Sequence, residues 1–270
     1  MKSSSAFIIL CLFVFFIPEN NYSEEKYVRS IQLPDGFERL PLNKNSFGEY
    51  LRNFPLKKKG SRVYLYNGNE KSYQNYHYAV LRIDTGKKDL QQCADAVMRL
   101  RAEYLFSQKQ YKRIRFNLTS GDPFPYSQWA RGYRPYIKNN RLYYQKKSGI
   151  SYDYPSFKKY LEFLFIYAGS YSLSREMAGV SNINQIKPGD VFIQGGFPGH
   201  AVIVMDTAKN IKTDESVFLL AQSYMPAQDI HILKNLEESG ISPWYSVRFS
   251  DRLKTPEWTF YKKDLKKFIN

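Results

Sequence analysis

The chain has 270 residues, of which 43% are hydrophobic and 24% charged, so it carries enough apolar material for a folded core. Its 40 Lys and Arg exceed the 25 Asp and Glu and give a net charge of +15, and its negative mean hydropathy excludes a multi-span membrane protein. Two Cys exclude a disulfide scaffold and a multi-thiolate zinc site, and three His leave little room for a histidine-built metal centre. We therefore expect neither a metal nor a cofactor.

The first 23 residues have the pattern of a signal peptide. Lys2 supplies the positive charge, and an apolar run over 6–17 follows it. That run is shorter than the roughly 20 residues of a membrane span. We expect cleavage near Ser23 and export to the periplasm, the cell envelope or the medium. The alternative is an uncleaved signal that anchors the protein in the membrane.

Cleavage would also remove one of the two cysteines. Cys11 lies in the signal, and the bulky Leu10 before it disfavours a lipidated cysteine there. The mature chain would then keep Cys93 alone, which is unusual for an exported protein. Its thiol is either buried and inert or kept for its chemistry.

Residues 24–70 are expected to form a basic, loop-rich N-terminal extension, and residues 71–270 an α+β domain. Hydrophobic periodicity predicts the elements of this domain in order: a strand over 78–83, a helix over 89–106, a strand over 113–118, an insertion around 119–155, a helix over 156–169 with a helical turn at 172–177, β-rich runs at 191–193, 201–205 and 217–223, edge strands within 243–260, and a basic helix over 262–268. The β-rich runs recur about every ten residues, which predicts an antiparallel meander or a small barrel.

Cys93 falls in the first turn of the helix predicted over 89–106. Asp89 is the expected N-cap, with Gln92 three residues later as in a capping box. The unpaired N–H groups and the dipole of a helix start favour an anion and lower a thiol pKa, so a nucleophilic cysteine suits this position. The alternative is a small apolar residue on the inner face of the helix.

His200 begins an apolar strand directly after a glycine-rich loop. In that setting the strand fixes the backbone while the ring faces a cleft. His77 and His231 lack such a setting and are expected to be surface or packing residues.

A cysteine–histidine pair usually needs a third group that orients the imidazole. Gln222 is the first choice because it lies in the next predicted strand, although it also fits a polar residue on a strand face. Asp206 is the competitor, but it lies at the other end of the histidine strand, about 20 Å away if that strand is extended.

The order of these features resembles that of the papain-like NlpC-type and CHAP-type amidases and peptidases of bacteria. The most specific portion is the pair of stretches 187–191 and 199–204, Lys-Pro-Gly-Asp-Val and Gly-His-Ala-Val-Ile-Val. The resemblance implies an α+β fold with helices packed on an antiparallel sheet, and it implies Cys93 as nucleophile, His200 as base and Gln222 as the orienting residue. The whole chain also resembles an uncharacterised family of exported bacterial proteins, which brings no established activity.

These observations favour an exported cysteine hydrolase that cleaves an amide bond, with peptidoglycan peptides as the expected substrate. Water would release the acyl-enzyme after the thiolate attack, and N–H groups at the helix start would stabilise the oxyanion. The alternative is a non-catalytic protein that keeps the papain-like fold and binds an envelope polymer.

The positive charge predicts attraction to anionic cell-envelope polymers or peptidoglycan, and the export signal makes nucleic acid an unfavoured partner. A basic stretch rich in tyrosine, 126–147, lies inside the expected insertion. Aromatic faces stack on sugars and guanidinium groups bind carboxylates, so Trp129, Arg131 and Arg134 are candidate substrate-binding residues. A solvated loop with anchoring tyrosines is the alternative.

Overall fold

The computed structural model describes residues 26–269. The expected signal peptide, 1–23, and Cys11 with it, lie outside the described residues. Within 26–269 no helix combines the length and the apolar character that crossing a membrane requires.

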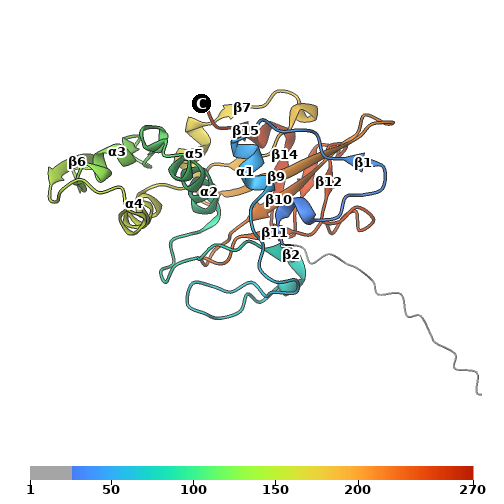
Figure 1. Ribbon diagram of the computed structural model, residues 1–270, viewed down its shortest axis with the longest axis horizontal. Helices are drawn as coiled ribbons and strands as arrows, with labels where there is room; N and C mark the ends of the chain where they lie inside the picture. Colours follow the sequence, from blue (N-terminus) through green and yellow to red (C-terminus); the bar gives the residue numbers. More distant parts are fainter. Residues whose placement is uncertain (1–25, 270) are drawn as a thin grey trace, which may run out of the picture.

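An antiparallel sheet forms the centre of the molecule (Figure 1). Its strands run in the order β2-β11-β10-β9-β8-β15-β7, with β1 paired to β9 and β12 paired to β10. The bounds are β1 (Phe37–Glu38), β2 (His77–Val80), β7 (Ala178–Gly179), β8 (Val191–Gln194), β9 (His200–Asn210), β10 (Ser216–Gln222), β11 (His231–Leu233), β12 (Tyr245–Ser246) and β15 (Leu265–Lys267). The predicted α+β class is confirmed, and the three predicted β-rich runs are neighbouring strands of the predicted meander.

The central strands are apolar because both faces of the sheet are covered. Along β9, Ala201 and Ile203 point into the core on one face, and Val202 and Val204 point into a second core on the other. The second core is closed by the hairpin of β13 (Arg252–Lys254) and β14 (Thr259–Tyr261), whose Leu253 and Phe260 are buried against the sheet.

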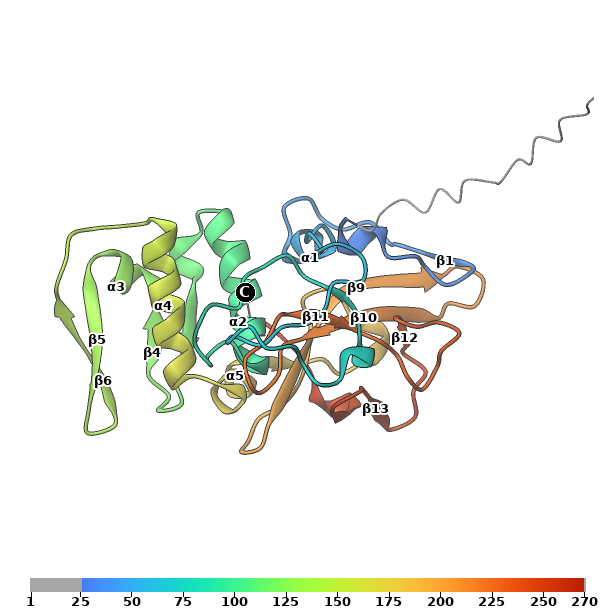
Figure 2. The ribbon, with the colours of Figure 1, turned by 90° about the horizontal axis from the view of Figure 1, so that it is seen from below.

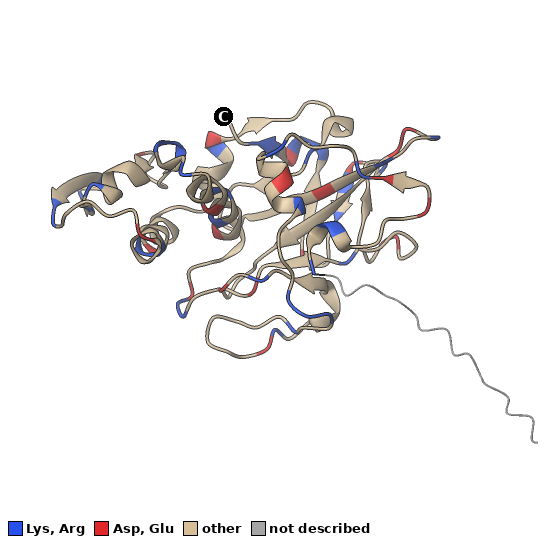
Figure 3. Cartoon of the chain, in the orientation of Figure 1, with Lys and Arg blue, Asp and Glu red and all other residues tan. Residues whose placement is uncertain are grey.

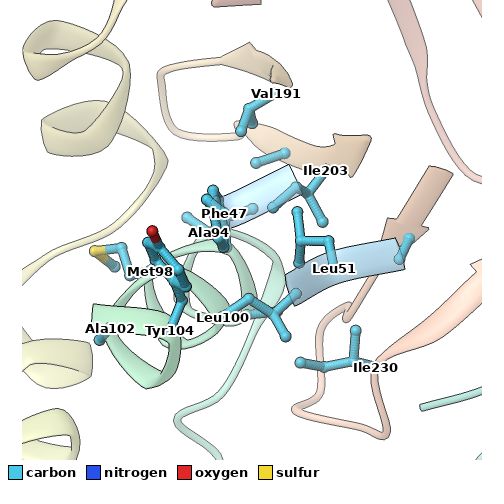
Figure 4. Close-up of a cluster of buried hydrophobic side chains, with 14 of the residues drawn as sticks. Phe47, Leu51, Ala94, Met98, Leu100, Ala102, Tyr104, Val191, Ile203 and Ile230 are labelled. Carbon is cyan, nitrogen blue, oxygen red and sulfur yellow. The ribbon is translucent and has the colours of Figure 1, made fainter. Parts of the chain in front are cut away.

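Helix α2 (Cys93–Ser107) packs on β9 and covers the first face. Figure 4 shows side chains of α1 and α2 meeting Val191 and Ile203 of the sheet in this core. The helices are α1 (Phe47–Arg52), α2, α3 (Tyr126–Ala130), α4 (Tyr154–Tyr167) and α5 (Ser170–Glu176), and the short 3-10 helices are η1 (Val28–Ser30), η2 (Gln74–Tyr76), η3 (Tyr111–Arg113), η4 (Ile183–Gln185) and η5 (Lys262–Asp264).

Residues 115–167, the side lobe, lie to one side of the sheet (Figures 1 and 2). The lobe contains helices α3 and α4 and two β-hairpins, in the region where the sequence predicts an insertion around 119–155. One hairpin joins β3 (Arg115–Asn117) to β4 (Pro123–Pro125), and the other joins β5 (Tyr133–Lys138) to β6 (Arg141–Lys146). Stacked rings join the lobe to α2, with the Phe106 and Phe157 ring centroids 4.3 Å apart. The lobe is therefore fixed to the helix that carries Cys93.

The described part of the expected N-terminal extension is loop-rich, but it is built into the main core. Val28 and Leu51 are fully buried there, and Phe37 of β1 pairs with Asn210 at the end of β9. The side chains of Arg39 and Arg52 both bind the buried carboxylate of Asp206.

The final basic helix predicted over 262–268 is wrong. The chain makes the single turn η5 and then continues as β15, which pairs with β8 on one side and β7 on the other. The Asp264 carboxylate accepts a hydrogen bond from the side chain of Gln194 at 2.7 Å, which holds this turn against the sheet. Without β15 the backbone groups of β8 would lack partners along one edge, and this pairing outweighs the helical tendency of a lysine-rich segment.

Candidate functional site

His200 is the first residue of β9, and its ring lies on the face of the sheet that carries the second core. The side chain is 2% exposed, and three aromatic rings surround it. Ring centroids lie 5.0 Å from it for Tyr224, 5.3 Å for Trp258 and 5.8 Å for Phe260. These rings pack closely around the imidazole and restrict its position.

Gln222, the last residue of β10, fixes that orientation by a hydrogen bond. The distance between His200 Nε2 and Gln222 Oε1 is 2.8 Å, and both side chains are buried. The two residues lie on adjacent antiparallel strands, as the sequence predicts. The competitor, Asp206, is bound to Arg39 and Arg52 at 2.7 and 2.6 Å toward the other end of β9.

The network beyond Gln222 determines which nitrogen of His200 carries the proton. Gln222 Nε2 donates to the Glu257 carboxylate at 2.6 Å, and the same oxygen accepts from Lys71 Nζ at 2.5 Å. The amide nitrogen of Gln222 thus faces Glu257, and its oxygen faces the histidine. His200 Nε2 must then be the donor, which leaves Nδ1 as the basic nitrogen of the neutral ring.

Cys93 is the first residue of α2, which begins four residues later than predicted. Asp89 is not the N-cap, because its carboxylate accepts from the Ala227 backbone N–H at 2.6 Å; Gln92 takes the N-cap position. The half-buried Cys93 thiol lies at the backbone amide of Ala201, the residue after His200. Among the hydrogen bonds of the described residues, none joins Cys93 to His200.

The charge states of the two side chains differ from those expected of a helix-start thiolate. Burial raises the pKa of Cys93 to about 11, and the carboxylate of Asp95 acts in the same direction. The backbone N–H groups of Ala201 and Ala94 lower this pKa but by less. Burial lowers the pKa of His200 to about 4, against the effect of its bond to Gln222. Near neutral pH both side chains are therefore uncharged.

The other two histidines lie close to this site as packing residues, which is one of the two alternatives expected from the sequence. His231 is fully buried in β11, and its ring centroid lies 6.1 Å from that of His77. The positive charge of Lys71 lowers the pKa of all three histidines, in each case after the larger effect of burial. Even so, within residues 26–269 no group of three or more His, Cys, Asp or Glu is arranged to hold a metal ion.

The predicted substrate-binding residues lie in the side lobe, apart from His200. Trp129 is buried in α3, and its ring nitrogen donates to Ser156 at 3.2 Å. The Arg134 guanidinium lies 4.4 Å from the Trp129 ring centroid and donates to the carbonyl oxygen of Trp129. Arg131 is exposed near the ring of Tyr133. The structure thus joins Trp129 and Arg134 as packing partners and does not bring them to the cysteine and histidine.

Sequence reasoning missed Lys71, Glu257, Tyr224 and Trp258. Lys71 and Glu257 are 186 positions apart and lie outside the regular strands, so no periodicity signals their contact. Tyr224 directly follows the predicted strand that carries Gln222. Its closeness to Gln222 in the sequence is the one signal that could have placed Tyr224 in the candidate site.

Comparisons with curated proteins and with solved structures each found no match. A comparison with family models found one described as a domain of unknown function (4846), DUF4846, over residues 28–267. That range includes the sheet, the side lobe and the cluster around His200, and the chain is a member of the DUF4846 family.

Proposed function

We propose that the protein is an exported, cysteine-dependent hydrolase with a papain-like fold of the NlpC/CHAP type, and that it cleaves an amide bond in peptidoglycan peptides. The observation that carries this proposal is the oriented imidazole. His200 donates from Nε2 to Gln222, which leaves Nδ1 as the basic nitrogen, and the Cys93 thiol lies at the backbone amide of Ala201, the next residue of β9. The hydrogen bonds from Gln222 and from Lys71 to Glu257 support a role for that orientation, because buried polar side chains are costly unless they are paired.

The neutral thiol and neutral imidazole favour general-base catalysis over a preformed ion pair. In the proposed step the thiol leaves the Ala201 amide and turns toward His200 at the start of β9, and its proton passes to His200 Nδ1 while the sulfur attacks the carbonyl carbon. The first N–H groups of α2 have no partner within the helix and can bind the oxyanion. The imidazolium then protonates the leaving amine. Water, deprotonated by His200, finally cleaves the thioester and restores the thiol.

The test is hydrolysis of soluble muropeptides by the purified protein, followed by mass spectrometry. Cys93→Ala should reduce cleavage to background, and His200→Ala should reduce the rate by about 10²–10⁴-fold, the usual contribution of a general base. His77→Gln is the matched control, because it changes a neighbouring histidine outside the His200–Gln222 pair and should leave the rate unchanged. Full cleavage by Cys93→Ala would overturn the proposal.

The pH profile tests the general-base step separately. Since His200 acts as a neutral base and its pKa lies at about 4, kcat/KM should rise as pH increases through about 4 and stay level to neutrality. A fall in kcat/KM that already begins as the pH is lowered from 7 to 6 would contradict the assignment of His200 as the base.

A second candidate function, a non-catalytic envelope-polymer binder on the same fold, is favoured by one observation. Cys93 and His200 are largely withdrawn from solvent and share no hydrogen bond within the described residues. A binder of this kind should be retained on peptidoglycan in a salt-sensitive manner, and Cys93→Ala or His200→Ala should not alter its retention.

A further inference from the structure

A cavity of about 370 Å³ lies away from the Cys93–His200 site, between the last turns of α2 and the start of the side lobe. Lys and Arg are spread over the whole molecule in Figure 3, but here four of them line one cavity. They are Arg101, Lys112, Arg113 and Arg115, and apolar side chains including Leu105, Phe116 and Phe268 complete the wall. The volume lies in the range of small-molecule sites.

Arg101 is the unusual member of this set. Its side chain is 8% exposed, yet no hydrogen bond or ion pair joins it to another of residues 26–269. Three aromatic rings surround the guanidinium, with centroids at 5.0 Å for Phe47, 5.3 Å for Phe268 and 5.5 Å for Tyr104. Rings stabilise a cation but supply no counter-charge. Buried charges are normally paired, because the desolvation penalty of an unpaired charge is not offset by any attractive interaction.

The acidic side chain in the wall does not neutralise Arg101. Glu176 accepts a hydrogen bond from the Asn117 backbone N–H at 2.9 Å, and its other carboxyl oxygen is buried without a partner among the described residues. Burial raises the pKa of Glu176 to about 7, so much of it is uncharged near neutral pH. The excess positive charge of the cavity therefore remains.

We propose that this cavity binds a phosphate group, with Arg101 as the buried anchor and Lys112, Arg113 and Arg115 at the mouth. The guanidinium fork matches the oxygen geometry of phosphate and donates two parallel hydrogen bonds to it. The apolar wall of Leu105, Phe116 and Phe268 accommodates the organic part of a phosphorylated molecule. Arg101 lies eight residues after Cys93 on α2, about 12 Å along the helix, so the cavity is a second site that does not depend on the proposed hydrolase activity.

The test is isothermal titration of the whole protein with inorganic phosphate and with pyrophosphate at constant ionic strength, with acetate as the comparison anion. The wild type should bind phosphate and pyrophosphate at one saturable site and bind acetate more weakly. Arg101→Met should weaken binding by at least about tenfold, because a charge-assisted hydrogen-bond pair is lost. Arg141→Met removes the same charge from an exposed position of β6 and should leave binding unchanged.

Thermal unfolding separates loss of the site from loss of the fold. Without ligand, Arg101→Met should melt at or above the wild-type temperature, because methionine fills a similar space without a buried charge. Pyrophosphate should raise the melting temperature of the wild type and of Arg141→Met, but not of Arg101→Met. Equal phosphate affinity in folded Arg101→Met and wild type, or the absence of a saturable site in the wild type, would overturn the proposal.

The source of the phosphate is distinguished by two further ligands. A small phosphomonoester that binds as tightly as inorganic phosphate indicates a soluble phosphorylated molecule. Tighter binding by a glycerol-phosphate polymer, still lost in Arg101→Met, indicates an envelope phosphodiester chain. If Arg101→Met binds the polymer as the wild type does, the polymer contacts the general positive surface and the cavity assignment fails.

Discussion

Asp95 and Cys93 are two positions apart in the first turn of α2, and they influence each other's protonation. Burial raises the pKa of Asp95 well above its usual value, and its ionised form raises the pKa of Cys93. One Asp95 oxygen accepts from the Gln92 backbone N–H at 3.0 Å, and the other is buried without a partner among the described residues. A helix start alone would lower the thiol pKa. At this residue, burial and a neighbouring carboxylate outweigh the helix.

The rate of Cys93 alkylation against pH measures this balance. The wild-type thiol should react slowly near pH 7 and titrate near its pKa of about 11. Asp95→Asn keeps an acceptor for the Gln92 N–H and removes the negative charge, so the thiol pKa should fall and alkylation at pH 8–9 should accelerate severalfold. A wild-type thiol that titrates below the free value of about 8.5, and moves upward in His200→Ala, would instead show a preformed ion pair.

At the scale of elements, the loop between β8 and β9 sets the position of His200 through close packing on α5. A Cβ at Gly199 would lie 2.3 Å from Ser170 Oγ and 2.6 Å from the backbone oxygen of Gln194. A Cβ at Gly195 would lie 2.0 Å from Ser174 Oγ. The glycine-rich sequence before His200 thus permits a close approach of the loop to the helix.

Gly199→Ala should therefore destabilise the fold by about 1–3 kcal/mol, the usual cost of overpacking, and should shift His200 at the start of β9. Urea unfolding measures the first effect and the hydrolysis rate measures the second. Gly149→Ala is the control, because nothing lies within 4 Å of a Cβ placed there. Equal stability of the two variants would show that the loop moves away from α5 at little cost.

The elements that the sequence predicts well are those with their own periodicity. Helices α2 and α4 and strands β8, β9 and β10 have apolar spacing that identifies them locally. The short strands β1, β7, β11 and β15 have two or three residues each and exist because a partner strand lies beside them. For the same reason, the pair of His200 and Gln222 could be predicted from adjacent strands, whereas the Lys71–Glu257 contact could not.

For the molecule as a whole, Asp206 joins the N-terminal segment to the sheet. Its carboxylate is fully buried and is shared by Arg39, from the loop after β1, and Arg52, at the end of α1. Arg39 also donates to the carbonyl oxygen of Ile31, which lies in the core. A single acidic side chain on β9 thus binds two segments that precede the domain boundary expected from the sequence.

Asp206→Ala should leave two partly buried guanidinium groups without a counter-charge and destabilise the protein by about 3–5 kcal/mol. Limited proteolysis should then cut first within residues 26–70, while the wild type resists cleavage there. Glu237→Ala is the control, since its carboxylate is exposed and pairs with Lys254 at the surface. Cleavage of Asp206→Ala at the wild-type rate would show that apolar packing alone holds the segment.

Strand β15 covers an edge of β8 that would otherwise be open to pairing with another chain. This strand lies between β8 and β7, although 70 residues, 195–264, separate it from β8 along the chain. A chain that stops before residue 265 leaves β8 as an open edge, and β8 is an apolar strand whose Val191, Phe192 and Ile193 are buried in the complete fold. An unprotected edge of that composition is a template for pairing with another copy. By pairing with β8, residues 265–267 block this self-association. A chain shortened before residue 265 should therefore aggregate more readily than the complete chain.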